Sequence, residues 1–314
     1  MVRPDYVLIA GTASGELASA IAAEAGLALA ACAVERFPDG EISVEIGESV
    51  RRREVVLIQS TSPPVNDHLV ELALLADACR RAAAAHITAI VPYFGYARSD
   101  RRRGRRSPIS ARAAADLLEG AGIGHLVTVD VHAPQIEGFF RIPTDDVSAI
   151  GPLSEALGSV EPDTIIVAPD PGAVRRARNF SRRLGCPMAL CLKQRLSGAE
   201  VEVTGVVGDV AGRSCVLIDD MISTGGTVVE SARALRAAGA RDVRAVLATH
   251  GVFTPPAVER LAGAGIGRIV VTDTVEPTPT LPASMARIDR VSVAPLLADV
   301  IQRLESGQSL RTLR

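Results

Sequence analysis

The residues from Val216 to Glu230, VLIDDMISTGGTVVE, place two kinds of ligand-binding group in close succession. Three apolar residues typical of a buried strand precede a pair of carboxylates, Asp219 and Asp220. Small residues follow, before a helix that we expect to begin at about Val228: Ser223, Thr224, Gly225, Gly226 and Thr227. Glycines let the backbone approach a ligand, hydroxyls and free N–H groups at a helix N-terminus bind phosphate, and paired carboxylates bind sugar hydroxyls or a metal. The stretch therefore predicts a site for a phosphorylated sugar, although Gly-Gly alone would indicate only a turn.

Among the 34 basic residues there is a single lysine, Lys193. GC-rich codons explain an excess of arginine, but a site that needs a compact point charge cannot use a guanidinium group instead. Retention of this lysine therefore indicates a function, with chance survival as the alternative. Arg195 lies two residues further on, so on a strand the two side chains would share a face and could bind one polyphosphate. The polar stretch Gln194–Ala199 is predicted to be a loop that closes over a substrate.

Polar residues also stand where other predicted strands end. Asp130 and His132 come at the end of LVTVDVH, and Asp170 comes at the end of TIIVAPD. Open α/β sheets bind ligands outside the carboxyl ends of their strands, so we expect these residues to lie near the pair at 219 and 220. His132 and Asp170 could ligate Mg²⁺, with water in the remaining positions. An orienting or core role for the histidine is the alternative.

A concentrated basic stretch runs from Arg98 to Arg106. It has three interpretations: nucleic-acid binding, recognition of a nucleotide or another anion, and a solvated charged loop. Aromatic residues stand only before the stretch, and the net charge of −2 gives no general reason for affinity to nucleic acids or membranes. We therefore predict nucleotide or anion recognition by Arg98, a solvated loop at Arg103–Arg106, and neither nucleic acid nor membrane as a partner.

Length and composition predict a globular protein with one large domain or two ordinary ones. The 314 residues are 47% hydrophobic, which is enough for a substantial core. The most apolar N-terminal region, residues 17–34, is interrupted by Glu24 and Gly26, so we expect neither a signal peptide nor a membrane span. Five cysteines without paired spacing are expected to be reduced and mostly buried, which indicates a cytoplasmic protein.

Apolar runs typical of strands alternate with helical patterns along the whole chain, which predicts an α/β fold with mainly parallel sheets flanked by helices. Asn66 or Asp67 is expected to cap one helix, and Gly172 to begin another. Val56–Ile58 corresponds to Val216–Ile218 at an offset of 160 residues, and the next helix and strand correspond at an offset of about 156. This faint internal repeat indicates that one α/β unit was duplicated. The first copy has Ser-Thr-Ser-Pro-Pro at 60–64 in place of the glycines, so we predict that it has lost the sugar-phosphate site.

Seven motifs together resemble those of ribose-phosphate diphosphokinases, the enzymes that make phosphoribosyl pyrophosphate from ATP and ribose 5-phosphate. They cover the chain essentially end to end: FPDGE (37–41), NDHLVEL (66–72), PYFGYARSDRR (92–102), TVDVHAPQIEGFF (128–140), APDPGAVRRA (168–177), GDVAG (208–212) and IDDMISTGGT (218–227). The resemblance implies two duplicated domains of phosphoribosyltransferase type. We place them at 1–147, with the ATP side and the degenerate sugar loop, and at 148–314, with the ribose 5-phosphate loop. The last helix, from Pro295, is expected to pack on the first domain.

The resemblance also assigns roles to individual residues. Residues expected to bind ATP are Phe37, Asp39, Gly40, Glu41, Arg98, Ser99 and Asp100. Mg²⁺ would be held by His132 and Asp170, and Lys193 and Arg195 would form the catalytic pair. The ribose 5-phosphate site would contain Arg195, Asp219, Asp220, Ser223, Thr224, Gly225, Gly226 and Thr227. A homo-oligomer is implied, a hexamer or a smaller even assembly, with the ATP site at a subunit interface.

Four departures from the usual motifs of the family stand out. Ser223 replaces Asp, Ser99 replaces Gln, Arg51-Arg52-Arg53-Glu54 replaces Arg-Gly-x-Asp, and Ala173 replaces the second glycine of its loop, which requires an ordinary φ there. The expected reaction is Mg²⁺-dependent transfer of the β,γ-diphosphoryl group of ATP to the 1-hydroxyl of ribose 5-phosphate, with release of AMP. Two alternatives are a phosphoribosyltransferase and a non-catalytic regulatory paralogue. The duplicated architecture argues against the first, and the complete set of catalytic residues argues against the second.

Overall fold

The structure is a computed structural model that describes residues 6–102, 104–195, 201–276 and 288–314, with the backbone alone at 193–195 and 201–203. The described chain divides into two compact units. Unit 1 contains the residues up to Ser148, Thr274–Glu276 and Ser292–Arg314. Unit 2 contains Ala149–Asp273 and the strand that ends at Val291. The last helix of the chain therefore belongs to the same unit as the N-terminal half.

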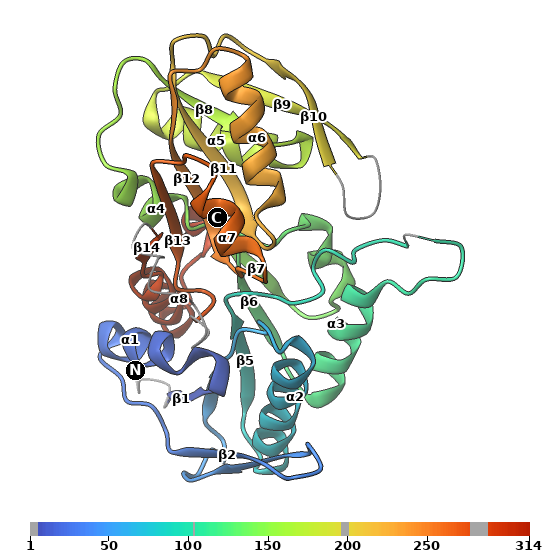
Figure 1. Cartoon of the computed structure of the whole chain (residues 1–314). Coiled ribbons are helices and arrows are strands. Elements are labelled where there is room, and N and C mark those ends of the chain that lie inside the picture. The colour runs from blue at the N-terminus through green and yellow to red at the C-terminus, as the bar shows by residue number, and fades with distance from the viewer. Residues whose placement is uncertain (1–5, 103, 196–200, 277–287) are drawn as a thin grey trace. The chain divides into compact units, whose positions relative to one another are not determined.

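Unit 1 is built on a five-stranded parallel sheet (Figure 1). In spatial order the strands are β1 (Tyr6–Ala10), β4 (Glu54–Ile58), β5 (His86–Val91), β6 (His125–Val129) and β7 (Thr144–Val147). Helices α2 (Val65–Arg81) and α3 (Ser110–Ala121) pack on one face, and α1 (Gly15–Ala25) and α8 (Ala294–Ser306) pack together on the other. Because helices cover both faces, the inner strands are apolar at almost every position, as predicted.

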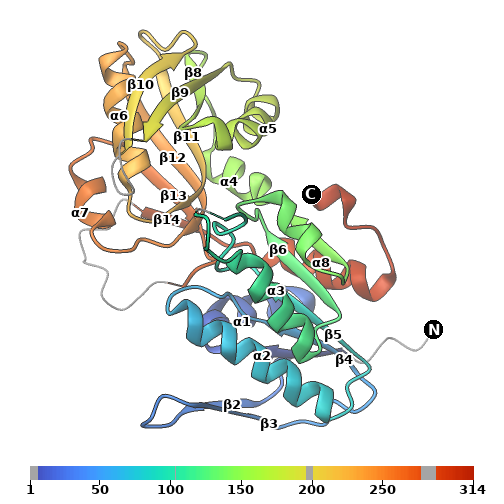
Figure 2. The ribbon, with the colours of Figure 1, turned by 90° about the vertical axis from the view of Figure 1, so that its right-hand side faces the viewer.

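A two-stranded antiparallel ribbon stands apart from this sheet in unit 1. It consists of β2 (Cys32–Arg36) and β3 (Ile42–Ile46), joined by the turn that contains Pro-Asp-Gly (Figure 2). Nothing in the sequence indicated that these two strands form a separate sheet. Before β2, Leu29 forms an isolated bridge with Leu8 of β1.

Unit 2 contains a seven-stranded sheet. Its spatial order is β10 (Val201–Val207), β9 (Met188–Arg195), β8 (Thr164–Ala168), β11 (Ser214–Ile222), β12 (Asp242–Gly251), β13 (Arg268–Thr272) and β14 (Ile288–Val291). Among the described strands of this sheet, only the β9–β10 pair is antiparallel. Figure 2 shows α6 (Gly226–Ala237) and α7 (Ala257–Ala262) on one face of the sheet, and α4 (Ile150–Leu157) and α5 (Val174–Leu184) on the other.

The two units have the same topology, which confirms the predicted duplication. The parallel order β1-β4-β5-β6-β7 in unit 1 is matched by β8-β11-β12-β13-β14 in unit 2. In each unit an antiparallel pair of strands is inserted after the first strand and its helix: the β2–β3 ribbon in unit 1 and the β9–β10 hairpin in unit 2. The predicted α/β class with mainly parallel sheets is therefore correct.

Several predicted boundaries were wrong. Helix α2 begins at Val65 with Pro64 as its N-cap, so neither Asn66 nor Asp67 caps it. A 3-10 turn over Pro171–Ala173 precedes α5, which begins at Val174 instead of Gly172. The sequence also missed three short elements: β7, α4 and α7. Short elements lack the length over which periodicity is visible, and the first two lie on either side of the predicted domain boundary between residues 147 and 148.

The cysteines are free thiols, as predicted, and four of the five are buried. Burial raises the pKa of the Cys79 and Cys215 thiols to about 12, so neither is a reactive thiolate at neutral pH. None of the helices in the described part of the chain combines the length and the apolar character that crossing a bilayer requires.

Candidate active site

The two carboxylates of the opening motif lie inside a strand and not after it. Strand β11 continues through Asp219 and Asp220 to Ile222, beside β12, whereas its pairing with β8 ends at Leu217. The expectation that the strand stops at Ile218 was therefore wrong. The carboxyl end of β11 extends past its neighbour β8, and this extension carries both acids.

Three carboxylates gather at this end of the unit 2 sheet. Burial raises the pKa of the Asp219 carboxyl well above its ordinary value, and the nearby Asp220 and Asp170 carboxylates raise it further. Asp220 is itself only 6% exposed. Neighbouring acids that repel one another favour any partner that supplies positive charge or hydroxyl donors. A sugar diol and a divalent cation both meet that requirement.

The loop after β11 has the shape of an anion site. Gly225 has φ 74°, and a Cβ added there would lie 3.2 Å from Leu261 Cγ, so this position requires glycine. Helix α6 begins at Gly226, two residues earlier than predicted, and its N-cap is Gly225, which has no side chain to occupy the first-turn N–H groups. A 12-residue helix with such an N-terminus attracts phosphate.

Ser223 and Thr224 are held in this loop by the segment around α7. The Ser223 and Thr254 hydroxyls are 3.2 Å apart, and Arg260 Nη1 donates to Thr224 O at 3.3 Å. The sequence did not predict Thr254 or Arg260 as supports. No local signal could have revealed them, because both contacts join residues more than 30 positions apart.

Asp170 closes the adjacent loop of unit 2, just after β8. Its Oδ1 accepts a hydrogen bond from the backbone N of Ala173 at 3.2 Å, which caps the 3-10 turn that leads into α5. Ala173 has φ −82°, so the ordinary conformation that its Cβ requires is confirmed. The acids of β11 and this loop thus lie at the same carboxyl edge, as the sequence predicted.

Lys193 and Arg195 lie on β9, the strand next to β8. Their backbones pair with Val203 and Val201 of β10. The predicted loop from Gln194 is therefore wrong at its first two positions, which belong to the strand, while 196–200 lie outside the described residues.

His132 lies in unit 1, so the predicted metal pair is divided between the units. It is exposed, three residues beyond the end of β6, and follows Asp130, whose φ is 45°. Within the part of the chain that the structure describes, no three His, Cys, Asp or Glu side chains form a ready-made metal cluster. A Mg²⁺ ion that keeps most of its waters and binds substrate phosphates needs no such cluster.

The residues expected to bind ATP form two groups in unit 1. Phe37, Asp39, Gly40 and Glu41 form the ribbon turn, which is closed by a hydrogen bond from Phe37 N to Glu41 O at 2.8 Å. Phe37 is 46% exposed there. The second group, Arg98, Ser99 and Asp100, follows β5, and Asp100 accepts a hydrogen bond from Gln135 in the His132 loop.

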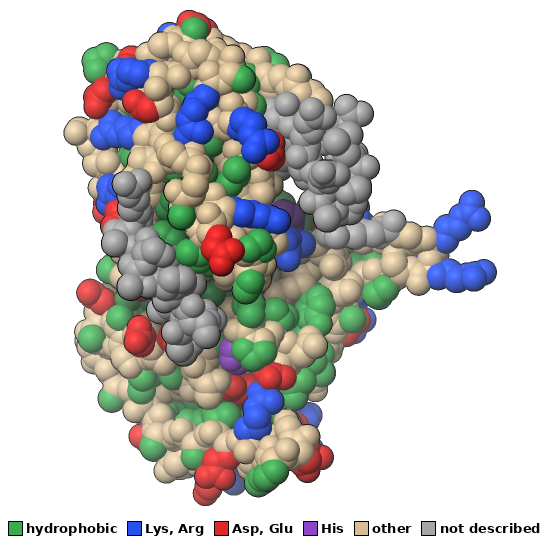
Figure 3. Space-filling model, viewed as in Figure 1, with side chains coloured by type: hydrophobic (Ala, Val, Ile, Leu, Met, Phe, Trp, Pro, Cys, Tyr) green, Lys and Arg blue, Asp and Glu red, His purple; other side chains and the backbone are tan. Residues whose placement is uncertain are grey.

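The first turn of α2 contacts the neighbours of both groups. Asp67 pairs with Arg36, next to Phe37, at 2.6 Å, and Asn66 accepts a hydrogen bond from Tyr96, two residues before Arg98. The two groups that the sequence assigned to one ligand are thus connected through one helix end. Beyond them, Arg101, Arg102, Arg105 and Arg106 are exposed, and Figure 3 shows blue side chains at the tip of their loop. Arg103 lies outside the described residues.

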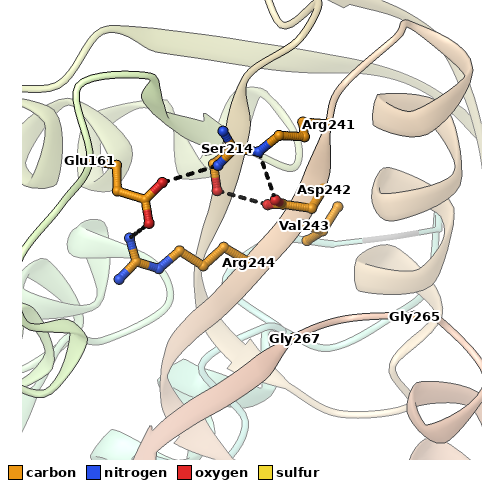
Figure 4. A pocket seen from close by; sticks show the side chains of 8 residues that line it. All are labelled: Glu161, Ser214, Arg241, Asp242, Val243, Arg244, Gly265 and Gly267. Atoms are coloured by element: carbon orange, nitrogen blue, oxygen red, sulfur yellow. Dashed lines mark hydrogen bonds and ion pairs between the residues drawn. The ribbon is translucent and has the colours of Figure 1, made fainter.

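A pocket of about 420 Å³ lies at the opposite edge of the unit 2 sheet, among residues that begin strands (Figure 4). It is lined by Glu161, Ser214, Arg241, Asp242, Val243, Arg244, Gly265 and Gly267. Its charges neutralise one another: Arg241 pairs with Glu161 at 3.1 Å and with Asp242 at 3.1 Å, and Ser214 Oγ donates to Asp242 at 2.7 Å. This network joins strand ends, and the carboxyl edge remains the candidate active site.

Two family models match the chain. The N-terminal domain of ribose phosphate pyrophosphokinase matches residues 6–122, and the phosphoribosyl synthetase-associated domain matches residues 194–314. A ribose-phosphate pyrophosphokinase from Caldanaerobacter subterraneus is 45% identical over 315 residues, which is 98% of this chain and 96% of the relative. One from Agrobacterium fabrum is 45% identical over 309 residues, 98% of this chain and 99% of the relative.

The fold agrees with these sequence matches. The crystal structure of phosphoribosylpyrophosphate synthetase from Mycobacterium smegmatis superimposes with a TM-score of 0.87 at 40% identity, covering 96% of this chain and 99% of that one. The likeness extends over both units. The chain is therefore an enzyme of the ribose-phosphate pyrophosphokinase family.

Proposed function

We propose that the protein makes phosphoribosyl pyrophosphate by transferring the β,γ-diphosphoryl group of ATP to the 1-hydroxyl of ribose 5-phosphate, with AMP as the second product. The observation that carries the proposal is the carboxyl end of β11. There an acid pair, of which Asp220 is buried and Asp219 is half-buried, lies next to a glycine-dependent helix N-terminus, which fits a sugar diol and its phosphate. Family membership supports the reaction, and this geometry supports the acceptor site.

In this proposal ribose 5-phosphate binds with its 2- and 3-hydroxyls donating to Asp219 and Asp220. Its phosphate binds the N–H groups and hydroxyls of residues 223–227. Ser223 stands where the family pattern has Asp, and its hydroxyl, 3.2 Å from Thr254 Oγ1, keeps a polar group at that position. The sugar is thereby oriented with its 1-hydroxyl free to react.

The donor ATP is proposed to bind Phe37, Asp39, Gly40 and Glu41 on the ribbon turn and Arg98, Ser99 and Asp100 after β5. Phe37 offers an exposed ring for stacking on the base. Arg98 supplies a positive charge for phosphate. A homo-oligomer, a hexamer or a smaller even assembly, and a cytoplasmic location also belong to the proposal, together with the absence of nucleic-acid or membrane partners.

Mg²⁺ is the proposed cofactor, held by His132 and Asp170. The crowding of Asp170, Asp219 and Asp220, which raises the pKa of Asp219, fits a divalent cation at this edge. When bound, Mg²⁺ would neutralise charge on the phosphates of ATP. The residues of the chain would contribute position and fixed charge.

The chemical step is an in-line displacement. The 1-hydroxyl oxygen of the sugar attacks the β-phosphorus, the bond from that phosphorus to the α,β-bridging oxygen breaks, and AMP and the hydroxyl proton are released. Catalysis of this kind depends on positioning and on charge stabilisation. Lys193 and Arg195 are proposed to stabilise the negative charge of the group in transfer.

The test is to incubate the purified protein with ATP, Mg²⁺ and ribose 5-phosphate and to measure AMP. We expect AMP and phosphoribosyl pyrophosphate in equal amounts, only when the sugar is present. A phosphoribosyltransferase would instead release pyrophosphate from phosphoribosyl pyrophosphate and a base. A non-catalytic paralogue would give no AMP by itself, and either result would overturn the proposal.

A further inference from the structure

The loop that carries His132 begins with an unfavourable backbone conformation. β6 ends at Val129, and Asp130 has φ 45°, in the left-handed region that a side chain disfavours. His132 and Gln135 follow, and Gln135 donates a hydrogen bond to Asp100. The turn at Asp130 thus directs a loop that contains one proposed metal ligand and contacts a proposed ATP ligand.

Side chains of the neighbouring edge strand hold this turn. Asp146 Oδ1, on β7, accepts hydrogen bonds from Val131 N at 2.9 Å and from Thr128 Oγ1 at 3.0 Å. Ser148 Oγ donates to Asp130 Oδ1 at 3.0 Å. Both residues that precede His132 are therefore fixed by contacts to β7 or to the residue just after it.

Unit 2 has the same strand ends with a different residue at this place. In each unit, one backbone hydrogen bond ends the pairing of the edge strand with its neighbour. Asp130 N donates it to Val147 O in unit 1, at 2.9 Å, and Asp273 N donates it to Val291 O in unit 2, at 3.0 Å. Counting back along the edge strand from that bond, Asp146 of β7 corresponds to Arg290 of β14. The carboxylate that holds the turn is thus present only in the copy that carries the histidine loop.

The preceding residue, Asp145, differs from Asp146 because it has an acidic counterpart in unit 2. It pairs with His125 at 2.9 Å, and its counterpart Asp289 pairs with Arg268 in unit 2. Each pair joins the start of an inner strand to the edge strand. Because both copies contain this pair, it belongs to the sheet and not to the histidine loop.

We propose that Asp146 is a positioning residue for the donor side of the active site: its carboxylate holds Val131 N, and so fixes the turn at Asp130 and the place of His132. The inference rests on the proposed function, since it gives His132 a role in the reaction. The competing explanation is that Asp146 only satisfies the buried hydroxyl of Thr128.

Three variants separate these explanations. Asp146→Ala removes the acceptor, and we expect the kcat for phosphoribosyl pyrophosphate formation to fall by up to about 10²-fold, because a misplacement of about 1 Å has that effect. Asp146→Asn keeps an acceptor oxygen and is expected to restore most of the activity. Asp145→Asn is the matched control on the same strand, and we expect it to lower the melting temperature while leaving kcat close to that of the wild type.

A double-mutant cycle tests whether Asp146 acts through His132. We expect Asp146→Ala to cost little in a protein that already carries His132→Ala, because the positioned group is gone. Independent losses in the cycle, a fully active Asp146→Ala variant, or a fully active His132→Ala variant would each overturn the inference.

Hydrogen exchange of the ligand-free protein supplies a readout that does not depend on catalysis. The amides of residues 130–133 should exchange faster in Asp146→Ala than in the wild type, Asp146→Asn or Asp145→Asn. Equal exchange in all four proteins would contradict the inference. If the wild type makes no sugar-dependent AMP, the proposed function fails by itself, and the exchange experiment still decides whether Asp146 holds the loop.

Discussion

The two units contain the same turns made from different residues. In unit 1, Arg52 N donates to Ala83 O at 2.8 Å, and in unit 2, Gly212 N donates to Gly239 O at 2.8 Å. Arg52 and Gly212 are 160 residues apart, and Ala83 and Gly239 are 156 residues apart, which are the offsets of the repeat in the sequence. The glycines have φ 68° and 85°, while Arg52 and Ala83 have φ 60°. Both units therefore have the left-handed backbone conformation at these turns, although unit 1 lacks the glycines that favour it.

The loops that follow the second parallel strand of each unit, β4 and β11, differ in role as well as in residues. In unit 1, Ser60, Thr61 and Ser62 are buried, and the first two hydroxyls bind the chain itself: Tyr93 N donates to Ser60 Oγ at 3.1 Å, and Gly95 N donates to Thr61 Oγ1 at 2.6 Å. In unit 2 the same place contains Gly225 and an open helix N-terminus. The comparison indicates that one copy of the loop became internal structure, which supports a sugar-phosphate site in unit 2 alone.

The inserted strand pairs also differ. The β2–β3 ribbon forms its own sheet and presents Phe37 at its turn, whereas β9 joins the main sheet of unit 2 and carries Lys193. One ancestral insertion thus has two proposed uses, ATP binding in unit 1 and charge stabilisation in unit 2. Variants can now test each side of the comparison.

The largest effect is expected from the unit 2 insertion. Lys193→Ala should lower kcat by about 10²–10³-fold, because one preorganised charge in the transition state has roughly that value. Lys193→Arg should recover little, since a guanidinium group has a different shape and hydration. Steady-state kinetics would measure both, with circular dichroism to show that the fold is intact. Near-normal turnover in the alanine variant would remove Lys193 from the mechanism.

The corresponding loops should fail in different ways. Gly225→Ala places a Cβ at φ 74° and 3.2 Å from Leu261, so we expect kcat/KM for ribose 5-phosphate to fall by about 10- to 10²-fold as the phosphate loop shifts. Thr61→Val leaves Gly95 N without its acceptor, and we expect it to lower the free energy of unfolding by about 1–3 kcal/mol.

Kinetics and denaturant unfolding of both variants decide between the two roles. The activity per folded molecule of Thr61→Val should equal that of the wild type. If Thr61→Val instead raised KM for the sugar, the unit 1 loop would retain a ligand role, and the contrast between the copies would be lost.

The sequence was sufficient for the fold class, the duplication and the inner strands, because continuous apolar runs and Gly-rich turns are local signals. It placed Asp170, Asp219 and Asp220 at one edge for the same reason. It missed β7, and with it Asp146, since a four-residue edge strand has no periodicity and its contacts are to a strand about 18 residues away. Supports such as Thr254 depend on the tertiary fold, which no spacing rule contains.

The acid pair should show a trade between stability and activity. Burial and the neighbouring carboxylates raise the pKa of Asp219, so its ionised form destabilises the ligand-free protein. Asp219→Asn should therefore raise the free energy of unfolding at pH 7 by on the order of 1 kcal/mol, while lowering kcat/KM for the sugar.

The pH dependence gives the sign of this effect. The wild type keeps its full stability below the pKa of Asp219 in the unfolded chain, about 3.9. It loses the contribution of this carboxyl as the pH rises through the pKa in the folded protein. Asp219→Asn has no carboxyl that titrates there, so its stability does not fall in this way. The difference in the free energy of unfolding between the two proteins should therefore grow as the pH rises and disappear in acid. Thermal melts of both proteins across that range would measure it. A variant that is less stable than the wild type at pH 7 would show that the carboxylate is favourably paired.

The smallest effect concerns the turns with which the comparison began. Arg52→Gly should relieve the left-handed conformation at φ 60°, but glycine also gains freedom in the unfolded chain, so we expect a rise of only about 0.5 kcal/mol in the free energy of unfolding. Gly212→Ala makes the reverse change in unit 2 and should destabilise by about 1 kcal/mol. Denaturant titrations of the two variants provide matched controls for each other. If both shifted stability in the same direction, the turns would differ in more than backbone strain. Shifts in opposite directions would show that the turn in unit 1 keeps a backbone conformation that favours glycine, although its glycine has been replaced.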